Sequence, residues 1–260
     1  MLVLASASPR RRKLLTQAGF SFEVHPAHIS EDPNPNEDPI AYVTRLAREK
    51  AQAVYNEIMG VPGPDFRTCE SANSHAIQAP LKGTGFSPYI QVVQDPGALA
   101  PEKSPSDSLN LGAPSISRSL RNGWESTNLD PQSLVVLGAD TTVTLDNQIL
   151  GKPENPADAA RMLRFLSGRT HRVITGVAVV TAAHTEVASE STSVQFLTLS
   201  DEQITAYIAT DEPMDKAGAY AIQGRAARWI PRIEGDYFNV VGLPISLVSR
   251  LLESLPQMTR

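Results

Sequence analysis

The order of apolar and polar positions predicts strands and helices at the start of the chain. Residues 2–5 form a short apolar run typical of a buried strand. Ser8, followed by a proline, is typical of a helix N-cap, and Gly19 ends that helix. Residues 20–25 predict a second strand. Asp38, also followed by a proline, begins a longer helix with one buried face. The apolar residues of that face are Ile40, Val43, Leu46, Ala47, Ala51 and Val54.

A second structured region follows near residue 134. Residues 134–139 form a continuous apolar strand, and the residues after them predict a hairpin that turns at Asp146 and Asn147. Asn155, again followed by a proline, predicts the start of a helix that Gly168 ends.

The remaining elements complete an α/β pattern. Residues 170–181 and 186–199 are rich in strand-forming side chains, and Ser200 with Gln203 matches a capping box at the start of a helix. A final helix begins near Pro244. Because strands and helices mix without regular alternation, we expect an α/β fold with a mixed, curved central sheet flanked by helices, forming two lobes around a cleft.

The composition changes between residues 60 and 132. This stretch of 73 residues contains nine prolines, seven glycines and ten serines and has no sustained helical or strand period. Such a sequence buries too little apolar surface to offset its ordering entropy. We therefore predict a single domain over residues 1–260, interrupted by a disordered insertion at about 60–132.

Charge, cysteine content and hydropathy narrow the class of protein. The 260 residues carry a formal charge of −5, which gives no overall basic surface for nucleic acid, so we expect no nucleic-acid partner. One cysteine, Cys69, excludes a disulfide within the chain. The longest mainly apolar stretch, residues 173–183, is shorter than the ~20 residues of a membrane-spanning helix. The N-terminus does not follow the order of a secretory signal, although an organelle transit peptide is an alternative. We expect a cytoplasmic protein without a membrane partner.

Candidate phosphate-binding groups begin directly after the first strand. A strand that runs into a helix started by proline presents backbone N–H groups where the helix dipole favours an anion. Ser6 and Ser8 add hydroxyl groups, and the guanidinium groups of Arg10 and Arg11 suit phosphate oxygens. The alternative is a capped helix with solvated arginines.

An aspartate follows the strand at residues 134–139. A carboxylate at the end of a buried strand lies where α/β proteins commonly bind ligands, so Asp140 is a candidate metal ligand or proton acceptor. A turn or cap aspartate is the alternative. Thr141 and Thr142 next to it are also compatible with a purely structural place in the sheet.

Other charged residues are individually weak candidates. Lys50 lies on the helix expected from Asp38, Lys152 precedes the helix expected at Asn155, and Lys216 lies in the segment DEPMDKAG. A lone lysine is usually a solvated surface residue. Glu31 and Asp32 follow a predicted strand and are candidate metal ligands, and Asp215 neighbours one of the lysines. Acidic loop residues normally face water.

Taken together, the motifs resemble one family. The sequence is similar to the Maf nucleoside triphosphate pyrophosphatases over residues 1–57 and 133–254. The resemblance is carried by the segments LASASPRRRKLL, YVTRLAREKA, LGADTTV, GKPENPADAARML and DEPMDKAGAYAIQG. It implies an α/β fold related to that of the inosine triphosphatases. The insertion resembles nothing we can name.

The resemblance also implies an activity. Family members hydrolyse nucleoside triphosphates to the monophosphate and pyrophosphate with a divalent metal ion, and the proton-accepting aspartate of the family falls on Asp140. Three specificity positions fall on Arg11, Thr141 and Gln223 and resemble those of the members that act on dTTP and UTP. The branch that acts on 7-methyl-GTP typically has SDQ where this chain has ADT. We therefore expect dTTP and UTP as substrates.

The implied site combines cations with two carboxylates. We expect Ser8, Arg10, Lys50, Lys152 and Lys216 to bind the phosphates. We expect Glu31 and Asp140 to meet the triphosphate through Mg²⁺ or Mn²⁺.

Two other functions stay open from the sequence. One is a 7-methyl-GTP pyrophosphatase of the same family, and the other is a non-catalytic nucleotide-binding regulator of cell division. Family members often dimerise, so a homodimer is a further expectation of the resemblance.

Overall fold

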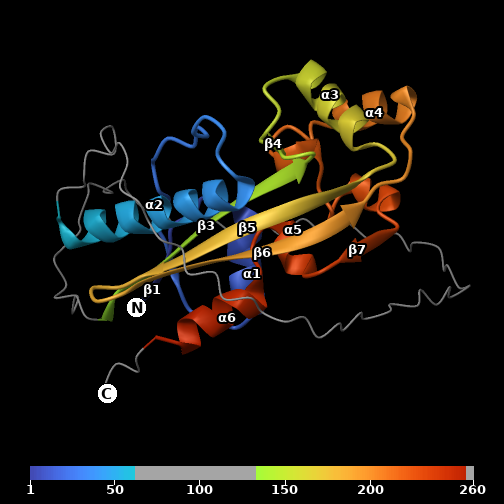
Figure 1. Ribbon diagram of the computed structural model, residues 1–260. Helices are drawn as coiled ribbons and strands as arrows, with labels where there is room; N and C mark the ends of the chain where they lie inside the picture. Colours follow the sequence, from blue (N-terminus) through green and yellow to red (C-terminus); the bar gives the residue numbers. More distant parts are fainter. Residues whose placement is uncertain (62–132, 256–260) are drawn as a thin grey trace, which may run out of the picture. The chain divides into compact units, whose positions relative to one another are not determined.

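The computed structural model describes residues 1–61 and 133–255 (Figure 1). The insertion predicted at 60–132 lies outside the described residues, apart from Gly60 and Val61. Gly60 adopts the left-handed conformation, with φ of 65°, that ends the helix before it. Within the described ranges, no helix has both the length and the apolar character needed to cross a bilayer.

A mixed sheet of seven strands forms the centre of the fold. Its order is β2-β1-β3-β5-β6-β7, and β4 pairs with β3 as well. The strand β1 runs parallel to β2 and β3, and the other pairs are antiparallel. The α/β fold with a mixed sheet is therefore confirmed. The strands are β1 (Leu2–Leu4), β2 (Glu23–Val24), β3 (Val135–Leu145), β4 (Gln148–Leu150), β5 (Thr170–Val180), β6 (Thr185–Gln195) and β7 (Arg232–Glu234).

Helices begin where the sequence places their caps. The side chains of Ser8, Asp38, Asn155 and Ser200 each accept a backbone N–H of the following helix, and Ser200 completes the capping box. The α-helices are α1 (Pro9–Gln17), α2 (Pro39–Met59), α3 (Pro156–Leu166), α4 (Asp201–Ile208), α5 (Tyr237–Val241) and α6 (Ile245–Glu253). Two 3₁₀ helices, η2 (Ala217–Ala219) and η3 (Arg225–Trp229), precede β7.

The hairpin between β3 and β4 also follows the prediction. Asp146 and Asn147 have φ of 51° and 64°, the positive values that a tight type I′ turn requires at both central positions. Aspartate and asparagine tolerate this conformation better than other residues with a side chain.

Three predicted strands differ from the structure. The strand expected at residues 186–199 ends at Gln195 as β6, because its pairing with β5 ends at Thr170. The strand expected at residues 20–25 shrinks to the two residues of β2. The strand expected to end at Ala139 continues through Asp140 to Leu145. Asp140 therefore lies in the middle of a strand and not at its end, because β5 pairs with β3 from Val136 to Thr144.

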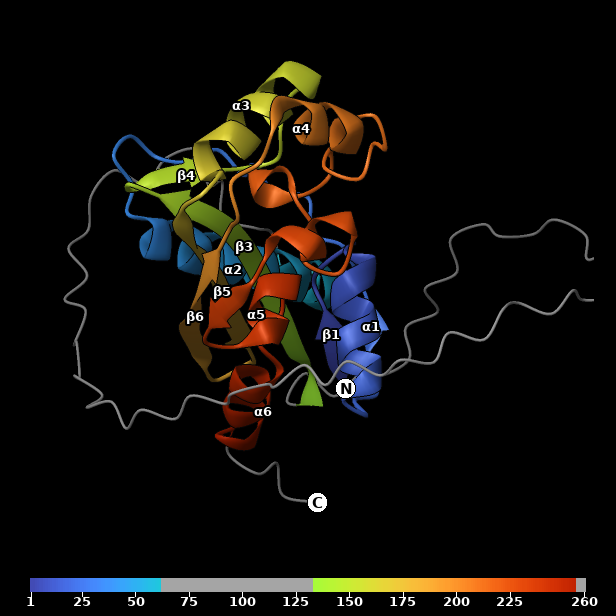
Figure 2. The same cartoon turned by 90° about the vertical axis from the view of Figure 1, so that its right-hand side faces the viewer.

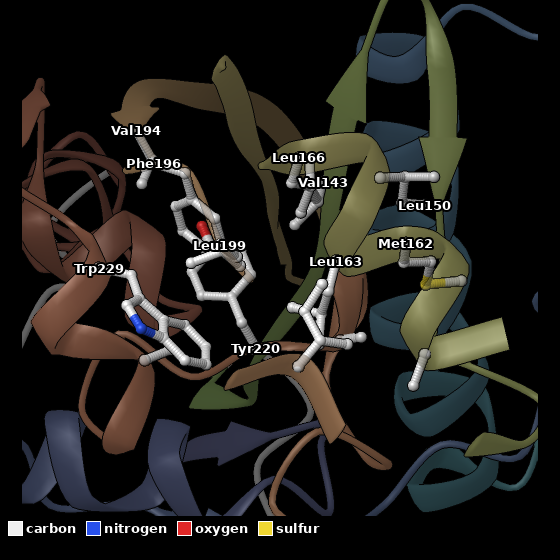
Figure 3. Close-up of a cluster of buried hydrophobic side chains, with 14 of the residues drawn as sticks. Val143, Leu150, Met162, Leu163, Leu166, Val194, Phe196, Leu199, Tyr220 and Trp229 are labelled. Carbon is white, nitrogen blue, oxygen red and sulfur yellow. The ribbon is translucent and has the colours of Figure 1, made fainter. Parts of the chain in front are cut away.

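Helices cover both faces of the sheet (Figure 1). The helix α2 packs on one face around Val136 and Ala178, and α1 with α6 packs on the other around Leu137 and Val177. A third cluster joins α3 and α4 to the far ends of β3 and β5, and its side chains point toward one another (Figure 3). In Figure 2, α3 and α4 lie at the opposite end of the sheet from α6. Asp140 lies on β3 between Leu137, which packs with α1 and α6, and Val143, which belongs to the third cluster.

The helix α2 approaches the sheet closely at two glycines. A Cβ atom on Gly138 would lie 2.1 Å from the carbonyl oxygen of Ala47, and one on Gly176 would lie 2.3 Å from that of Val43. Real Cβ atoms essentially never make such contacts. Only glycine at these positions lets the backbone of α2 rest directly on β3 and β5.

We expect Gly138→Ala to destabilise the protein by about 3 kcal/mol, because the new methyl group must push α2 off the sheet. The free energy of unfolding, measured by denaturant titration, checks this. Gly151→Ala is the matched control, since a Cβ there meets nothing within 4 Å. Equal stability of the two variants would contradict the close packing of α2.

Candidate active site

One cavity of about 740 Å³ is lined by every residue that the sequence singles out for the site. Its lining is built from the start of α1, from α2, from the middle of β3 and from the loops before α3 and around η2. The sequence-predicted residues that it brings together are Ser8, Arg10, Arg11, Glu31, Lys50, Asp140, Thr141, Lys152, Lys216 and Gln223.

The cavity opens at a gap along one edge of β3. On that edge β1 pairs with residues 135–137 and β4 pairs with residues 143–145. Neither strand pairs with residues 138–142, where Asp140 lies. The backbone of β3 is therefore accessible to side chains and ligands at this point, although β5 still holds its other edge.

A buried lysine joins two carboxylates in the cavity. The Nζ atom of Lys50 lies 2.7 Å from Oδ1 of Asp140 and 2.6 Å from Oε1 of Glu31. Lys50 and Asp140 are both 7% exposed. A buried ammonium group requires such partners, since desolvation of an unpaired charge is costly. The second oxygen of Asp140 makes no hydrogen bond to any described residue and is available to a ligand.

The charge of Lys50 favours the ionised form of Glu31. Burial opposes the ionisation of Glu31, but the hydrogen bond and charge of Lys50, with the charges of Lys152 and Arg11, outweigh it and hold the pKa of Glu31 below its ordinary value. Tyr42 donates its hydroxyl to the main-chain oxygen of Glu31 at 2.9 Å. Burial and the nearby carboxylates raise the pKa of Tyr42 to about 12, so its hydroxyl stays protonated.

Arg11 crosses the gap in the edge of β3. Its guanidinium group donates to the main-chain oxygens of Gly242 at 2.8 Å and Ala139 at 2.9 Å. It also donates to the hydroxyls of Thr141 at 3.0 Å and Ser6 at 3.2 Å. Four of its five N–H groups are thus used inside the protein. Burial lowers the pKa of Arg11, and the charge of Asp140 opposes that effect. One N–H group is left for a ligand, so bidentate phosphate binding by Arg11 would break existing bonds.

Thr141 is supported by two residues that the sequence did not single out. Its hydroxyl lies 3.0 Å from that of Thr175, which donates to the main-chain oxygen of Asn239 at 3.2 Å. The fully buried amide of Asn239 donates to β5 at Val173 and to β6 at Thr192, each at 2.9 Å. Nothing in the local sequence marks these contacts, because they join residues far apart in the chain.

The start of α1 meets the segment before η2 across the cavity. Ser8 caps α1 by accepting from the N–H of Arg11, as predicted, and its hydroxyl faces the cavity. Arg10 lies 3.5 Å from Asp215, whose other oxygen bonds Lys216. Burial opposes the ionisation of Asp215, but these two cations outweigh it and keep its pKa below the ordinary value. Asp215 therefore holds two of the predicted phosphate-binding groups.

Lys152 and Gln223 lie on the rim. Both side chains belong to exposed residues that line the cavity. Lys152 makes no hydrogen bond or ion pair with the residues that the structure describes, so its charge is available to an anion.

The donor chemistry of the cavity suits a hard divalent cation. Mg²⁺ and Mn²⁺ prefer carboxylate oxygens, and Mg²⁺ is commonly held by one or two carboxylates together with substrate phosphates. Glu31 and Asp140 supply two carboxylates joined through Lys50. No group of three or more His, Cys, Asp or Glu side chains within the described residues is placed to hold a metal ion. The residues present thus fit a cation whose other ligands come from phosphate.

Comparison with known proteins gives consistent matches over nearly the whole chain. A family model described as "Maf-like protein" matches residues 1–79 and 96–255. A protein named dTTP/UTP pyrophosphatase from Koribacter versatilis is 39% identical over 96% of this chain and 92% of its own length. A protein of the same name from Moorella thermoacetica is 40% identical over 96% and 93%. One from Thermococcus onnurineus is 36% identical over 97% of both chains.

These matches cover all three hydrophobic clusters and the whole of the cavity lining. The resemblance found in the sequence motifs is therefore confirmed, and the chain belongs to the Maf-like protein family.

Proposed function

We propose that this protein hydrolyses dTTP and UTP to the nucleoside monophosphate and pyrophosphate, with a divalent metal ion and with Asp140 as the proton acceptor. The relatives named dTTP/UTP pyrophosphatase support the reaction and the substrate class. The observation that carries the chemistry is the carboxylate pair of Asp140 and Glu31, held by one lysine inside a cavity lined by four further cations.

The contacts of Asp140 support its proposed role as the base. One of its oxygens is fixed by Lys50, and the other is open to the cavity. A water molecule that attacks the α-phosphorus transfers a proton to this open oxygen as the new P–O bond forms. The bond from the α-phosphorus to the α,β-bridging oxygen breaks, and that oxygen leaves as part of pyrophosphate. The nucleoside keeps the α-phosphate.

The cations stabilise the charge that develops on pyrophosphate. Arg10, Lys152 and Lys216 line the same cavity, and fixed positive groups around a leaving phosphate lower the barrier to its departure. A bound Mg²⁺ or Mn²⁺ would be held by Glu31 and Asp140 and would supply further neutralisation of the phosphate charge. Ser8 adds a hydroxyl donor at the start of α1.

We assign base recognition to Gln223, Thr141 and Arg11, which line the same cavity. Gln223 carries both a donor and an acceptor, which matches the alternating edge of a pyrimidine such as thymine or uracil. Thr141 and Arg11 form a hydrogen-bonded pair next to Asp140. In this role Arg11 shapes the pocket and fixes Thr141, in keeping with the protein contacts that occupy most of its donors.

Asp140→Asn tests the base directly. The amide has the same shape and cannot accept the proton, so we expect kcat to fall by about 10²–10⁴-fold with the fold retained. Pyrophosphate release from dTTP and circular dichroism measure the two effects. Asp146→Asn makes the same change at the turn after β3 and leaves kcat unchanged. Near-normal turnover by the Asp140 variant would refute the role.

Lys50→Met tests the shared lysine through pH. Because the pKa of Glu31 is lowered in the folded wild type, its carboxylate stabilises the fold at pH values above the ordinary pKa of 4.5. This stabilisation is lost as the pH falls through the pKa of Glu31 in the folded state. Without Lys50, burial and repulsion between Glu31 and Asp140 favour protonation, so acid stabilises the variant. We therefore expect the difference in thermal midpoint between the variant and the wild type to shrink as the pH is lowered from about 7 to about 4.

Lys13→Met is the control for that experiment, because Lys13 is exposed on α1. Its thermal midpoint is expected to follow the wild type at every pH. A constant difference between wild type and Lys50→Met across the range would show that Lys50 acts by packing alone.

A substrate panel tests the proposed reaction as a whole. We expect pyrophosphate release from dTTP and UTP with Mg²⁺ or Mn²⁺, weaker turnover of CTP and 7-methyl-GTP, and loss of activity on chelation. Steady-state kinetics with a pyrophosphate assay measure this. A preference for 7-methyl-GTP would move the protein to the other branch, and binding without turnover would support a regulator.

A further inference from the structure

Gln223 belongs to a turn between η2 and η3, outside any strand or α-helix. The turn is closed by one main-chain bond, from the N–H of Gly224 to the oxygen of Ala221 at 3.0 Å. A side chain that reads a base must be held in place, and a single turn bond does not fix the orientation of the turn relative to the cavity. Other contacts must do so.

Glu212 supplies one of these contacts. It lies in the segment after α4, and its Oε1 accepts the N–H of Arg225 at 3.0 Å. The carboxylate lies so close to the turn that a Cβ on Gly224 would be 1.9 Å from Oε1. The residue after Gln223 must therefore be glycine for this carboxylate to occupy its place.

Tyr207 supplies the second contact from inside the core. Its hydroxyl donates to Oε1 of Glu212 at 2.9 Å and accepts the N–H of Ala221 at 3.2 Å. The ring is 1% exposed and packs edge-on against Trp229 at 5.1 Å. The position of the hydroxyl is thus set by the core of α4 and η3.

The two side chains hold the turn on both sides of Gln223. Tyr207 binds the N–H two residues before it, and Glu212 binds the N–H two residues after it. Neither Tyr207 nor Glu212 lines the cavity. Their contacts with the site pass through the turn, apart from the main-chain oxygen of Glu212, which lies 3.4 Å from Nζ of Lys216.

We propose that Glu212 and Tyr207 form a clamp that positions Gln223 and so sets the base preference of the cavity without taking part in the chemistry. This inference rests on the proposed function, since it takes Gln223 as the residue that meets the base. Loosening the clamp weakens recognition of the pyrimidine and leaves the phosphate groups and Asp140 in place.

Tyr207→Phe is the sharpest test, because it removes one oxygen and keeps the buried ring. With wild-type turnover of dTTP established, we expect its KM for dTTP and UTP to rise about tenfold, with kcat within about twofold. The preference for dTTP over CTP, measured as the ratio of kcat/KM, falls by a similar factor. Inhibition by pyrophosphate, which needs no base contact, stays at the wild-type level.

Glu212→Ala is expected to give the same pattern, and Glu212→Gln, which keeps an acceptor oxygen, is expected to restore most of the wild-type KM. Glu253→Gln removes a carboxylate on α6 and is the control without effect. If Glu212→Ala fails to fold in a thermal-unfolding assay, Tyr207→Phe decides.

Three results would overturn the clamp: unchanged KM and preference, a fall in kcat alone, or an equal loss for every nucleotide. Wild-type protein that releases pyrophosphate from neither dTTP nor UTP would instead refute the proposed function. The two failures are therefore distinguished by the wild-type measurement.

Discussion

Lys50 is 7% exposed, and a buried ammonium group requires an oppositely charged partner. In this protein the ion pairs of Lys50 with Glu31 and Asp140 fix the geometry of the site. The ion pair between Lys50 and Asp140 depends on how closely α2 approaches the sheet. Gly138 and Gly176 let the backbone of α2 rest on β3 and β5, which brings Lys50 within reach of Asp140 on the same face. A bulkier residue at either glycine would separate the ammonium group from its partner.

The second constraint is the unpaired stretch of β3. A strand edge without a neighbour leaves main-chain groups to be satisfied, and at this edge Arg11 binds the oxygen of Ala139. The same guanidinium group binds Thr141 and Gly242. The gap that admits a ligand is therefore also the place where α1, β3 and the end of α5 are tied together. The same unpaired stretch of β3 thus joins these elements and leaves room for a ligand.

The local elements of this fold were predictable from the sequence because their signals are local. The caps at Ser8, Asn155 and Ser200 and the turn at Asp146 each depend on a few neighbouring residues. The extent of β3 was not predictable from its apolar run, since Asp140 continues the strand as a buried polar residue. Pairing with β5 keeps the strand extended through it.

The composition of the cavity was also within reach of sequence reasoning, since each predicted residue lines it. Its connections were not. Asn239 and Thr175, or Glu212 and Arg225, are ordinary polar residues whose partners lie 64 and 13 positions away. Short elements such as β7 and α5 carry no period of their own and exist because β6 and β5 give them a surface to pair with or pack on.

The bonds of Arg11 also bear on the order in which the protein is made. The guanidinium group of Arg11 binds the main-chain oxygen of Gly242, which lies 231 positions later in the chain. It also binds that of Ala139, 128 positions later. Almost the entire polypeptide must therefore leave the ribosome before the contacts around the pocket can form, because contacts between distant segments require both segments. Nascent chains that stop before α5 carry an arginine without its final partner and hold no finished pocket.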